Sequence, residues 1–534
     1  MKLDPITLEV VWSRLISLVD EAAANLVRTS FSTVVRESND YACVITDKNG
    51  NSLVQSSLSI PSFISTLPQT VKEMLKVYSK ESLTPGDVLI TNNPWLGTGH
   101  LPDINIVVPI FSNNTLIGFS ATVAHSPDIG GRIRSPEASE LFEEGIQIPI
   151  DKLIISGKEN VSLVNLIREN VRVPDMVMGD IWAQITANQT AGKGLLNIME
   201  EYNLKDIENL ANTIQSRSEQ AIRDEIRQLS NGEYNYTVSG DGFETPIRIQ
   251  LKLTIENDDI FIDYAGTSEQ VPRALNVVLA YTFAYTVYPI KCILSPDIPN
   301  NEGCFRPIHV KAPKGTILNP EYPASVGARA LTGHLLPPAI FGVFASIVPN
   351  QVQAASGSPL WAVHMAGKNR GKRYASVFFF NGGQGASLNQ DGYPCLSFPS
   401  NVSATPVEVL EQNFPIHIHE KSLRKGSGGE GQFRGGLGQR LVIEHIGDSP
   451  ANISFMAERI KNPAFGLLGG GSGSRGKVFL NDKEINPKDR YVMDPGDVLT
   501  CETPGGGGFG DPQKREKERL NSDIKNQYVN EVSK

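Results

Sequence analysis

The sequence contains few cysteines, and they form no recognisable framework. The five cysteines stand at positions 43, 292, 304, 395 and 501, without any C-x-x-C spacing. Small disulfide-bonded domains and cysteine-rich zinc sites both depend on closely spaced cysteines. The sequence therefore predicts a reduced protein, and we expect it in the cytoplasm.

Long apolar runs and an excess of basic residues are also missing. No apolar run approaches the roughly 20 residues of a membrane span, and the N-terminus shows no apolar signal core after a basic start. The 49 basic and 58 acidic residues give a net charge of -9, and no basic cluster offsets it. Protein surfaces that bind nucleic acid are basic, so we expect no nucleic acid among the partners. Because no apolar run is long enough for a membrane span, we expect no membrane either.

Glycine is unusually frequent, with 48 residues beside 34 prolines in a chain of 534 residues. Such a length is too great for one compact core. Helical patterns dominate the first half, whereas glycine runs alternate with β-rich segments past residue 380. We predict an α+β protein with an N-terminal α+β domain at 1–230, a central α+β domain at 231–375, a glycine-rich β domain at 376–512 and a charged tail at 513–534.

Hydrophobic periodicity supplies the expected elements. Asp4 is a suitable cap for a helix over 4–30, with Pro5 in its first turn. Further helices are expected over 66–80, from Pro174 onward and over 205–229. A β-rich stretch follows with strands over 234–240, 247–256 and 259–264, and then come a buried helix over 274–294 and a helical run over 323–345.

One short region combines the side chains of a metal site. His100 and Asp103 form an H-x-x-D pair at the start of the apolar run 104–111. A second apolar run, 116–124, ends at His125. If the two runs pair as strands, two imidazoles and a carboxylate meet at their ends. Three protein ligands with one position open for water is the composition of a catalytic metal site.

The same residues also have a simpler explanation, in which His100 and His125 are half-buried and hydrogen-bonded to nearby backbone. Upstream, Glu37 and Asp40 precede an expected strand over 41–46. Each is either a capping or turn carboxylate, or a fourth metal ligand or general base, and Asp40 is favoured as the ligand. We predict metal ligation by Asp40, His100, Asp103 and His125, and catalytic roles for Glu37 and Asp40.

Three other features each have two interpretations. The loop 132–144 is either a lid over the site or a subunit contact. His417 and His419 alternate with isoleucine, so both point to one strand face, which we predict to be solvated and not a second metal site. The expected helix from Pro174 onward carries three short polar side chains on one face: Asp180, Gln184 and Asn188. This face is either solvated or in contact with protein or ligand.

The glycine runs do not form a nucleotide site. Neither 469–473 nor 503–512 continues as the Gly-Lys-Ser/Thr of a P-loop, so we predict no ATP site in this chain. The loop 381–386 is either a plain turn or a place where backbone meets a ligand. Elsewhere we interpret the runs as tight turns and sites of close backbone approach.

Six segments, taken together and in this order, point to a family. They are LDPITLEV at 3–10, RESND at 36–40, GHLPD at 99–103, SGG at 427–429, RGG at 434–436 and TPGGGGFGDP at 503–512. Across nearly its whole length the chain resembles the B subunit of ATP-dependent hydantoinases and oxoprolinases. Gly426 stands where many relatives are expected to carry Asp, and Trp182 where Arg is expected. Those departures concern substrate choice or packing more than the metal loop.

The resemblance implies a function shared between two subunits. In that family an A subunit with an actin-like ATPase fold phosphorylates the carbonyl oxygen of a lactam or cyclic imide, whereas the B subunit holds a metal and completes ring opening. It implies metal ligation by His100, Asp103 and His125, with Asp40 as an added carboxylate. The implied partners are a hydantoinase A-type ATPase subunit that holds the ATP, in a hetero-oligomer, and a small cyclic amide.

The chemistry expected of such a subunit is hydrolysis. Amide resonance resists attack, and phosphorylation of the oxygen makes the carbon far more electrophilic. A divalent metal lowers the pKa of water toward about 7, and Glu37 or Asp40 can accept the proton. Histidine with carboxylate suits Zn, Mn or Fe alike. We expect an enzyme active only with its partner; the alternatives are a subunit of an ATP-dependent ketone carboxylase and a non-catalytic scaffold.

Overall fold

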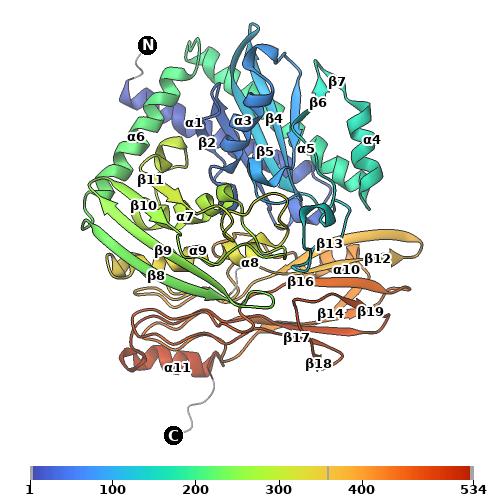
Figure 1. Ribbon diagram of the computed structural model, residues 1–534, viewed down its shortest axis with the longest axis vertical. Helices are drawn as coiled ribbons and strands as arrows, with labels where there is room; N and C mark the ends of the chain where they lie inside the picture. The colour runs from blue at the N-terminus through green and yellow to red at the C-terminus, as the bar shows by residue number, and fades with distance from the viewer. Residues whose placement is uncertain (1–3, 358–359, 530–534) are drawn as a thin grey trace.

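Four β-sheets with helices around and between them make up the protein (Figure 1). The computed structural model describes residues 4–357 and 360–529, so Leu3 and residues 530–534 of the predicted tail lie outside the described residues. The predicted α+β class is confirmed. None of the helices in the described ranges has the length and apolar character needed to cross a membrane.

The N-terminal sheet has seven strands in the order β2-β1-β5-β4-β3-β6-β7. The two predicted apolar runs are β4 and β5, and Asn113 and Asn114 join them with φ of 48° and 63°, which suits a hairpin turn. This hairpin orders the site described below. The strands are β1 Tyr41–Asp47, β2 Ser52–Gln55, β3 Val88–Thr91, β4 Asp103–Ser112, β5 Thr115–His125, β6 Asp151–Ile155 and β7 Lys158–Glu159.

Helices cover both faces of this sheet, which is why β1 is buried along its whole length. Tyr41, Cys43 and Ile45 pack with helices α1 and α5, while Ala42 and Val44 pack with α3. This alternation follows from the two-residue period of a strand. The helices are α1 Pro5–Thr29, α2 Thr33–Arg36, α3 Thr66–Val77, α4 Val161–Asn170 and α5 Pro174–Glu201.

The polar face predicted on α5 lies against the sheet. Asn188 donates through Nδ2 to Thr122 Oγ1 at 2.9 Å, and Thr122 donates to Gln184 Oε1 at 3.2 Å. Asp180 Oδ1 accepts a hydrogen bond of 2.7 Å from the Phe31 amide. The short polar side chains are therefore buried in protein contacts, and the solvated interpretation of this face is wrong.

The predicted cap of the first helix is confirmed. Asp4 Oδ1 accepts hydrogen bonds of 3.1 Å from the amides of Ile6 and Thr7, and Pro5 occupies the first helical position. A carboxylate at this place satisfies amides that no helical carbonyl reaches.

A central sheet follows, in the order β11-β10-β9-β8. In β9 buried aliphatic residues alternate with more exposed ones, and α9 packs on the buried face. The predicted helix 274–294 begins only at Leu279. The elements are α6 Glu208–Ile226, β8 Gly232–Gly240, β9 Ile247–Glu256, β10 Asp259–Asp263, α7 Leu279–Leu294, β11 Ile308–Lys311, α8 Arg329–Gly333 and α9 Leu336–Phe344.

The predicted helical run 323–345 is wrong in its first part. Residues 324–328 form a loop, and the helices α8 and α9 are separate. Pro337 lies in the first turn of α9, where its missing amide costs nothing but where a continuous helix would lose a hydrogen bond. The loop 324–328 contributes to the site described below.

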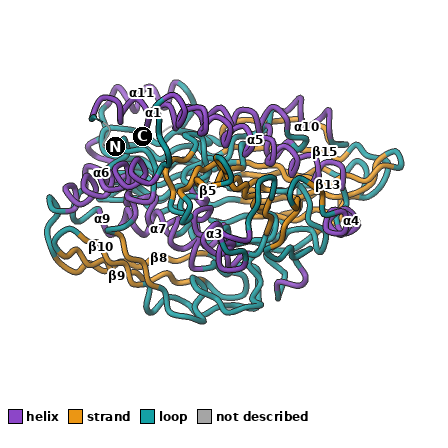
Figure 2. The backbone as a smooth tube through the Cα atoms, turned by 90° about the horizontal axis from the view of Figure 1, so that it is seen from above, coloured by secondary structure: helices purple, strands orange, loops and turns teal. Residues whose placement is uncertain are grey.

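Two sheets pack face to face in the C-terminal part. Their orders are β13-β12-β16-β19 and β14-β15-β20-β17-β18, and a shared apolar cluster fills the space between them. Seen from above (Figure 2), β13 and β15 lie toward one end of the molecule and β9 and β10 toward the other. The elements are β12 Trp361–Asn369, β13 Lys372–Phe380, α10 Val407–Asn413, β14 Ile416–Leu423, β15 Gln439–His445, β16 Ala451–Met456, β17 Lys477–Leu480, β18 Lys483–Glu484, β19 Tyr491–Met493 and β20 Val498–Glu502.

Glycine-rich segments beside this sandwich hydrogen-bond to one another through their backbones. Gly383 donates to Pro504 O at 3.0 Å, Gly506 donates to Gly436 O at 2.9 Å, and Gly436 donates to Gln384 O at 2.8 Å. A Cβ atom on Gly506 would lie 2.0 Å from Gln384 O. Glycine is required because these backbones approach too closely for any side chain, which confirms the expected close approach.

The predicted charged tail includes an ordered helix, α11 Lys517–Lys525. Arg515 bridges the tail to the glycine-rich body, with 2.8 Å to Asp391 Oδ1 and 2.6 Å to Asp523 Oδ2. The domain ranges stay predictions; the boundary at 230 lies between α6 and β8, and that at 375 lies inside β13.

Replacing Gly506 with alanine is expected to lower the free energy of unfolding by about 1–3 kcal/mol, because the new methyl group overlaps a carbonyl oxygen. Gly471→Ala is the matched control, since its Cβ would meet its nearest neighbour at an ordinary 3.5 Å. Chemical denaturation measures both variants. Equal losses in the two variants would contradict the close-approach explanation.

Candidate metal centre

The β4–β5 hairpin places two of the predicted ligands opposite each other. Asp103 is the first residue of β4 and His125 the last of β5, and the antiparallel register pairs them directly. The His125 amide donates a hydrogen bond of 3.0 Å to Asp40 O, which ties the end of β5 to the residue before β1. The predicted strand pairing therefore brings these side chains together.

His100 reaches the same point from the loop between β3 and β4. Asn92 fixes this loop by donating to Leu101 O at 2.9 Å and to Ile146 O at 2.9 Å. Gly99 has a φ of +92°, and a Cβ atom there would lie 2.8 Å from Arg329 Nε. Both its backbone conformation and the closeness of the guanidinium require glycine at this position.

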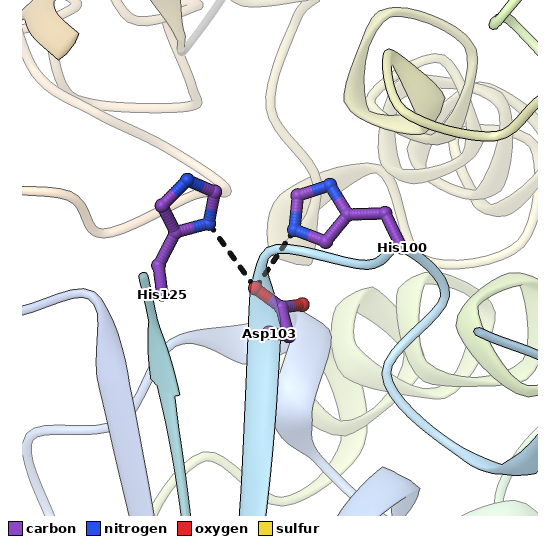
Figure 3. A group of neighbouring side chains, drawn as sticks. All are labelled: His100, Asp103 and His125. Atoms are coloured by element: carbon purple, nitrogen blue, oxygen red, sulfur yellow. Dashed lines mark hydrogen bonds and ion pairs between the residues drawn. The ribbon is translucent and has the colours of Figure 1, made fainter. Parts of the chain in front are cut away.

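The imidazoles of His100 and His125 converge on one carboxylate oxygen of Asp103 (Figure 3). His100 Nε2 lies 2.7 Å and His125 Nδ1 lies 3.1 Å from Asp103 Oδ1. All three possible ligand atoms lie within 4.8 Å of one another, and all three residues are buried. The structure thus brings together three of the four predicted ligands.

Arg329, the first residue of α8, completes the surroundings of Asp103. Its guanidinium donates to Asp103 Oδ2 at 2.6 Å. The guanidinium carbon Cζ lies over the Tyr281 ring, 4.2 Å from the ring centroid. Burial opposes ionisation of Asp103, but its interactions with His100 and with the Arg329 guanidinium outweigh burial and hold its pKa below the usual value. Asp103 is therefore a carboxylate.

The hydrogen-bonding of His100 tests whether a cation fits. Its Nδ1 lies 3.3 Å from Gly327 O, and its Nε2 faces Asp103 Oδ1. Burial, reinforced by the charge of Arg329, lowers the pKa of His100 well below its usual value, so the ring carries one N–H for two acceptors. A metal ion held by Nε2 and Oδ1 resolves this mismatch, and two imidazoles with one carboxylate fit Zn, Mn or Fe.

The two carboxylates predicted upstream differ in position. Asp40 is buried, and its Oδ2 lies 3.9 Å from His125 Nδ1. Burial raises the pKa of Asp40, an effect that His125 opposes and Asp103 reinforces. Glu37 lies half-buried at the C-terminal end of α2, and within the described ranges its side chain makes no ion pair with the three converging residues. The roles of both stay predictions.

A cavity opens beside His125, and the loop 132–144, which we interpreted as either a lid or a subunit contact, forms part of its wall. Arg134 on that loop donates through Nε to Gly327 O at 2.7 Å. His364, from β12, also lines the cavity. Sequence patterns did not single out Arg134, Gly327, Arg329 or His364, because their neighbours in space are distant in sequence. The one signal in the sequence was the loop 132–144, rich in Arg and Glu, which carries Arg134.

The other histidine pair differs from this arrangement in kind. His417 and His419 have side chains that are 51% and 45% exposed, and they pair with Glu411 and Glu444. The strand face that carries them is thus solvated, as predicted.

Several known proteins resemble this chain in sequence. Residues 4–512 match the family described as hydantoinase B/oxoprolinase. A protein of Methanocaldococcus jannaschii is 34% identical over 99% of this chain and 94% of its own length. A Pseudomonas sp. protein, provisionally named as the B subunit of a D-/L-hydantoinase, is 30% identical over 99% of this chain and 93% of its own length.

Solved structures also share the fold. The ATP-dependent caprolactamase from Pseudomonas jessenii superposes with a TM-score of 0.92 at 26% identity, covering 99% of this chain and 95% of that one. A nucleotide-free acetone carboxylase superposes with a TM-score of 0.89 at 19% identity, covering 99% of this chain and 78% of that one.

Arg329→Met is expected to destabilise the chelator-treated protein by about 3–5 kcal/mol, because it leaves the buried Asp103 without its cationic partner. Arg132→Met is the control: its side chain is 31% exposed and pairs with Glu143, so its loss is expected to stay within about 1 kcal/mol. Urea denaturation compares the variants. A loss of no more than about 1 kcal/mol for Arg329→Met would show that the Arg329–Asp103 pair contributes little to stability.

Proposed function

The chain belongs to the hydantoinase B/oxoprolinase family, and we propose that it is the metal-bearing B subunit of an ATP-dependent cyclic amidohydrolase. Its substrate is the phosphorylated form of 5-oxoproline, a hydantoin or another lactam. The observation that carries the proposal is the convergence of His100, Asp103 and His125 beside a cavity. The caprolactamase with the same fold, itself ATP-dependent, supports a lactam-type substrate.

The ATPase step is assigned to a partner. The sequence has no P-loop, and the Pseudomonas relative of nearly equal length is named as one subunit of a hydantoinase. We propose an A-type subunit that phosphorylates the carbonyl oxygen of the ring, in a hetero-oligomer with this chain. The phosphorylated ring carbon is then open to attack by water.

The site residues have separate parts in that attack. His100, Asp103 and His125 hold a divalent cation, and when bound such an ion supplies Lewis acidity that lowers the pKa of water. Asp40, with Oδ2 3.9 Å from His125 Nδ1, is close enough to join the ligands or to accept a proton. Arg329 fixes the Asp103 carboxylate, so that Oδ1 remains directed at the two imidazoles.

The cavity suits an anionic substrate group. Burial and the charge of Arg329 lower the pKa of Arg134 to about 10, so Arg134 is a cation at neutral pH. Its guanidinium donates to the carbonyl of Gly327, and in the described part of the chain no carboxylate forms an ion pair with it. A phosphoryl group provides the charge and acceptor oxygens that a guanidinium binds.

Two alternatives remain distinct in their consequences. The acetone carboxylase shares the fold, so a carboxylase subunit that consumes a ketone and bicarbonate is the second candidate. A scaffold that only positions the partner is the third, and it needs no metal.

Elemental analysis of the purified chain is expected to find one equivalent of Zn, Mn or Fe, because the three ligand atoms lie within 4.8 Å. His100→Ala/His125→Ala is expected to lose the metal and keep its circular dichroism spectrum. His417→Ala/His419→Ala, which removes two exposed histidines, is expected to retain it. A wild-type chain that stays metal-free after reconstitution would favour the scaffold.

The chain alone is expected to be inactive, and the chain with an A-type subunit and ATP is expected to open a lactam without bicarbonate. His100→Ala is expected to lower turnover on the order of 10²-fold or more, since metal catalysis contributes several kcal/mol at about 1.4 kcal/mol per tenfold. Product analysis with each of the three substrate types measures this. Ketone consumption that requires bicarbonate would reject the hydrolase in favour of the carboxylase.

A further inference from the structure

Glu144 is a buried carboxyl group at the wall of the cavity. Glu144 follows the 3₁₀ turn Leu141–Glu143 at the end of the loop 132–144, and it is only 8% exposed. Oε1 accepts hydrogen bonds of 2.7 Å from the amides of Val326 and Gly327 and another from the Ser325 hydroxyl. One oxygen of this carboxyl thus holds the loop that reaches His100.

The second oxygen has no such role. Glu144 Oε2 is buried and has no hydrogen-bond partner among the described residues. Leaving a buried polar atom unpaired costs about 1–3 kcal/mol, so its retention calls for an explanation. His364 Nε2, at the same cavity, is likewise buried and, in the described part of the chain, unpartnered. Two residues that line one cavity thus each carry an unpartnered polar atom, which indicates a polar ligand that supplies the partners.

The proton of Glu144 has a definite place. Burial raises its pKa to about 7, against the hydrogen bonds to Oε1 and the charge of Arg134, which lower it. Because three donors already point at Oε1, the proton of the neutral form resides on Oε2. The charged and titratable groups at the same cavity are Arg132, Arg134, Arg172, Asp128, His125 and His364.

Most of the other charges around the cavity are already paired. Arg172 pairs with Asp128 at 2.6 Å, and Arg132 pairs with Glu143 at 2.6 Å. Within the described chain this leaves Arg134 as a cation without a carboxylate, and Glu144 as an acid with a free oxygen. A ligand with an anionic group for Arg134 and a basic nitrogen for Glu144 satisfies both residues.

We propose that Glu144 is a catalytic residue that donates the Oε2 proton to the ring nitrogen of the phosphorylated substrate. The inference rests on the proposed function. As the oxygen of water bonds to the ring carbon, the C=N π bond breaks and its electron pair goes to nitrogen. That nitrogen takes the proton of Glu144, which becomes a carboxylate. The proton released by the water passes to solvent or to Asp40, and solvent later reprotonates Glu144.

Glu144→Gln isolates this step. The amide oxygen can accept the same three hydrogen bonds, and the amide nitrogen takes the place of Oε2, so the loop 325–327 keeps its anchor. In the complex with the A-type subunit, kcat is expected to fall by about 10²–10⁴-fold, as loss of a general acid does, with little change in KM. Glu143→Gln, at the adjacent partly exposed residue, is the control and is expected to leave kcat unchanged.

The pH profile separates proton transfer from anchoring. A general acid acts in its protonated form, so kcat/KM of the wild type is expected to fall as pH rises through about 7, and this limb is expected to vanish in Glu144→Gln. Ser325→Ala removes a hydrogen bond that stabilises the carboxylate, so it is expected to shift the limb to higher pH. This second variant decides the matter if Glu144→Gln does not fold.

A measurement without substrate completes the test. Difference infrared titration of wild type against Glu144→Gln is expected to show a protonated carboxyl band that disappears near pH 7. If the wild-type complex turns over a lactam but Glu144→Gln matches it in kcat and pH profile, the role of Glu144 is rejected and the proposed function stands. If no wild-type complex opens a cyclic amide, the proposed function fails first.

Discussion

The carboxylate of Asp103 is the point on which the arrangement of the site depends. Its Oδ1 receives the two imidazoles and its Oδ2 receives Arg329. These partners come from a loop, from the end of a strand and from a helix that begins 226 residues later in the chain. A single buried charge thus fixes the relative positions of the N-terminal sheet and α8, because an uncompensated carboxylate in a buried site is costly.

Local sequence patterns predicted the parts of the site that one hairpin brings together. The apolar runs 104–111 and 116–124 are strands of nearly those bounds, and their register alone places Asp103 opposite His125. Arg329 escaped prediction for a physical reason. Its contact with Asp103 depends on the packing of α8. The sequence pattern predicted one helical run over 323–345, whereas the prolines in the first turn of α9 start a separate helix.

The glycine-rich half shows a different limit of sequence analysis. Frequent glycines predicted close backbone approach, and the structure places glycine segments against one another. The sequence does not reveal which segment neighbours which, because a side chain of one hydrogen atom leaves no pattern of size or charge to pair. Gly383 and Gly506 are recognised as neighbours of Gly436 only through their backbone hydrogen bonds and close approach.

The shared carbonyl of Gly327 has a consequence for thermodynamic linkage. This oxygen faces both His100 and Arg134, and Glu144 holds its loop, so one peptide group joins the N-terminal loop, the cavity wall and the segment before α8. Any species that binds this folded assembly and not its separated parts adds its binding free energy to their association. Ligand binding at the site and docking of these distant segments are therefore thermodynamically coupled, and each strengthens the other.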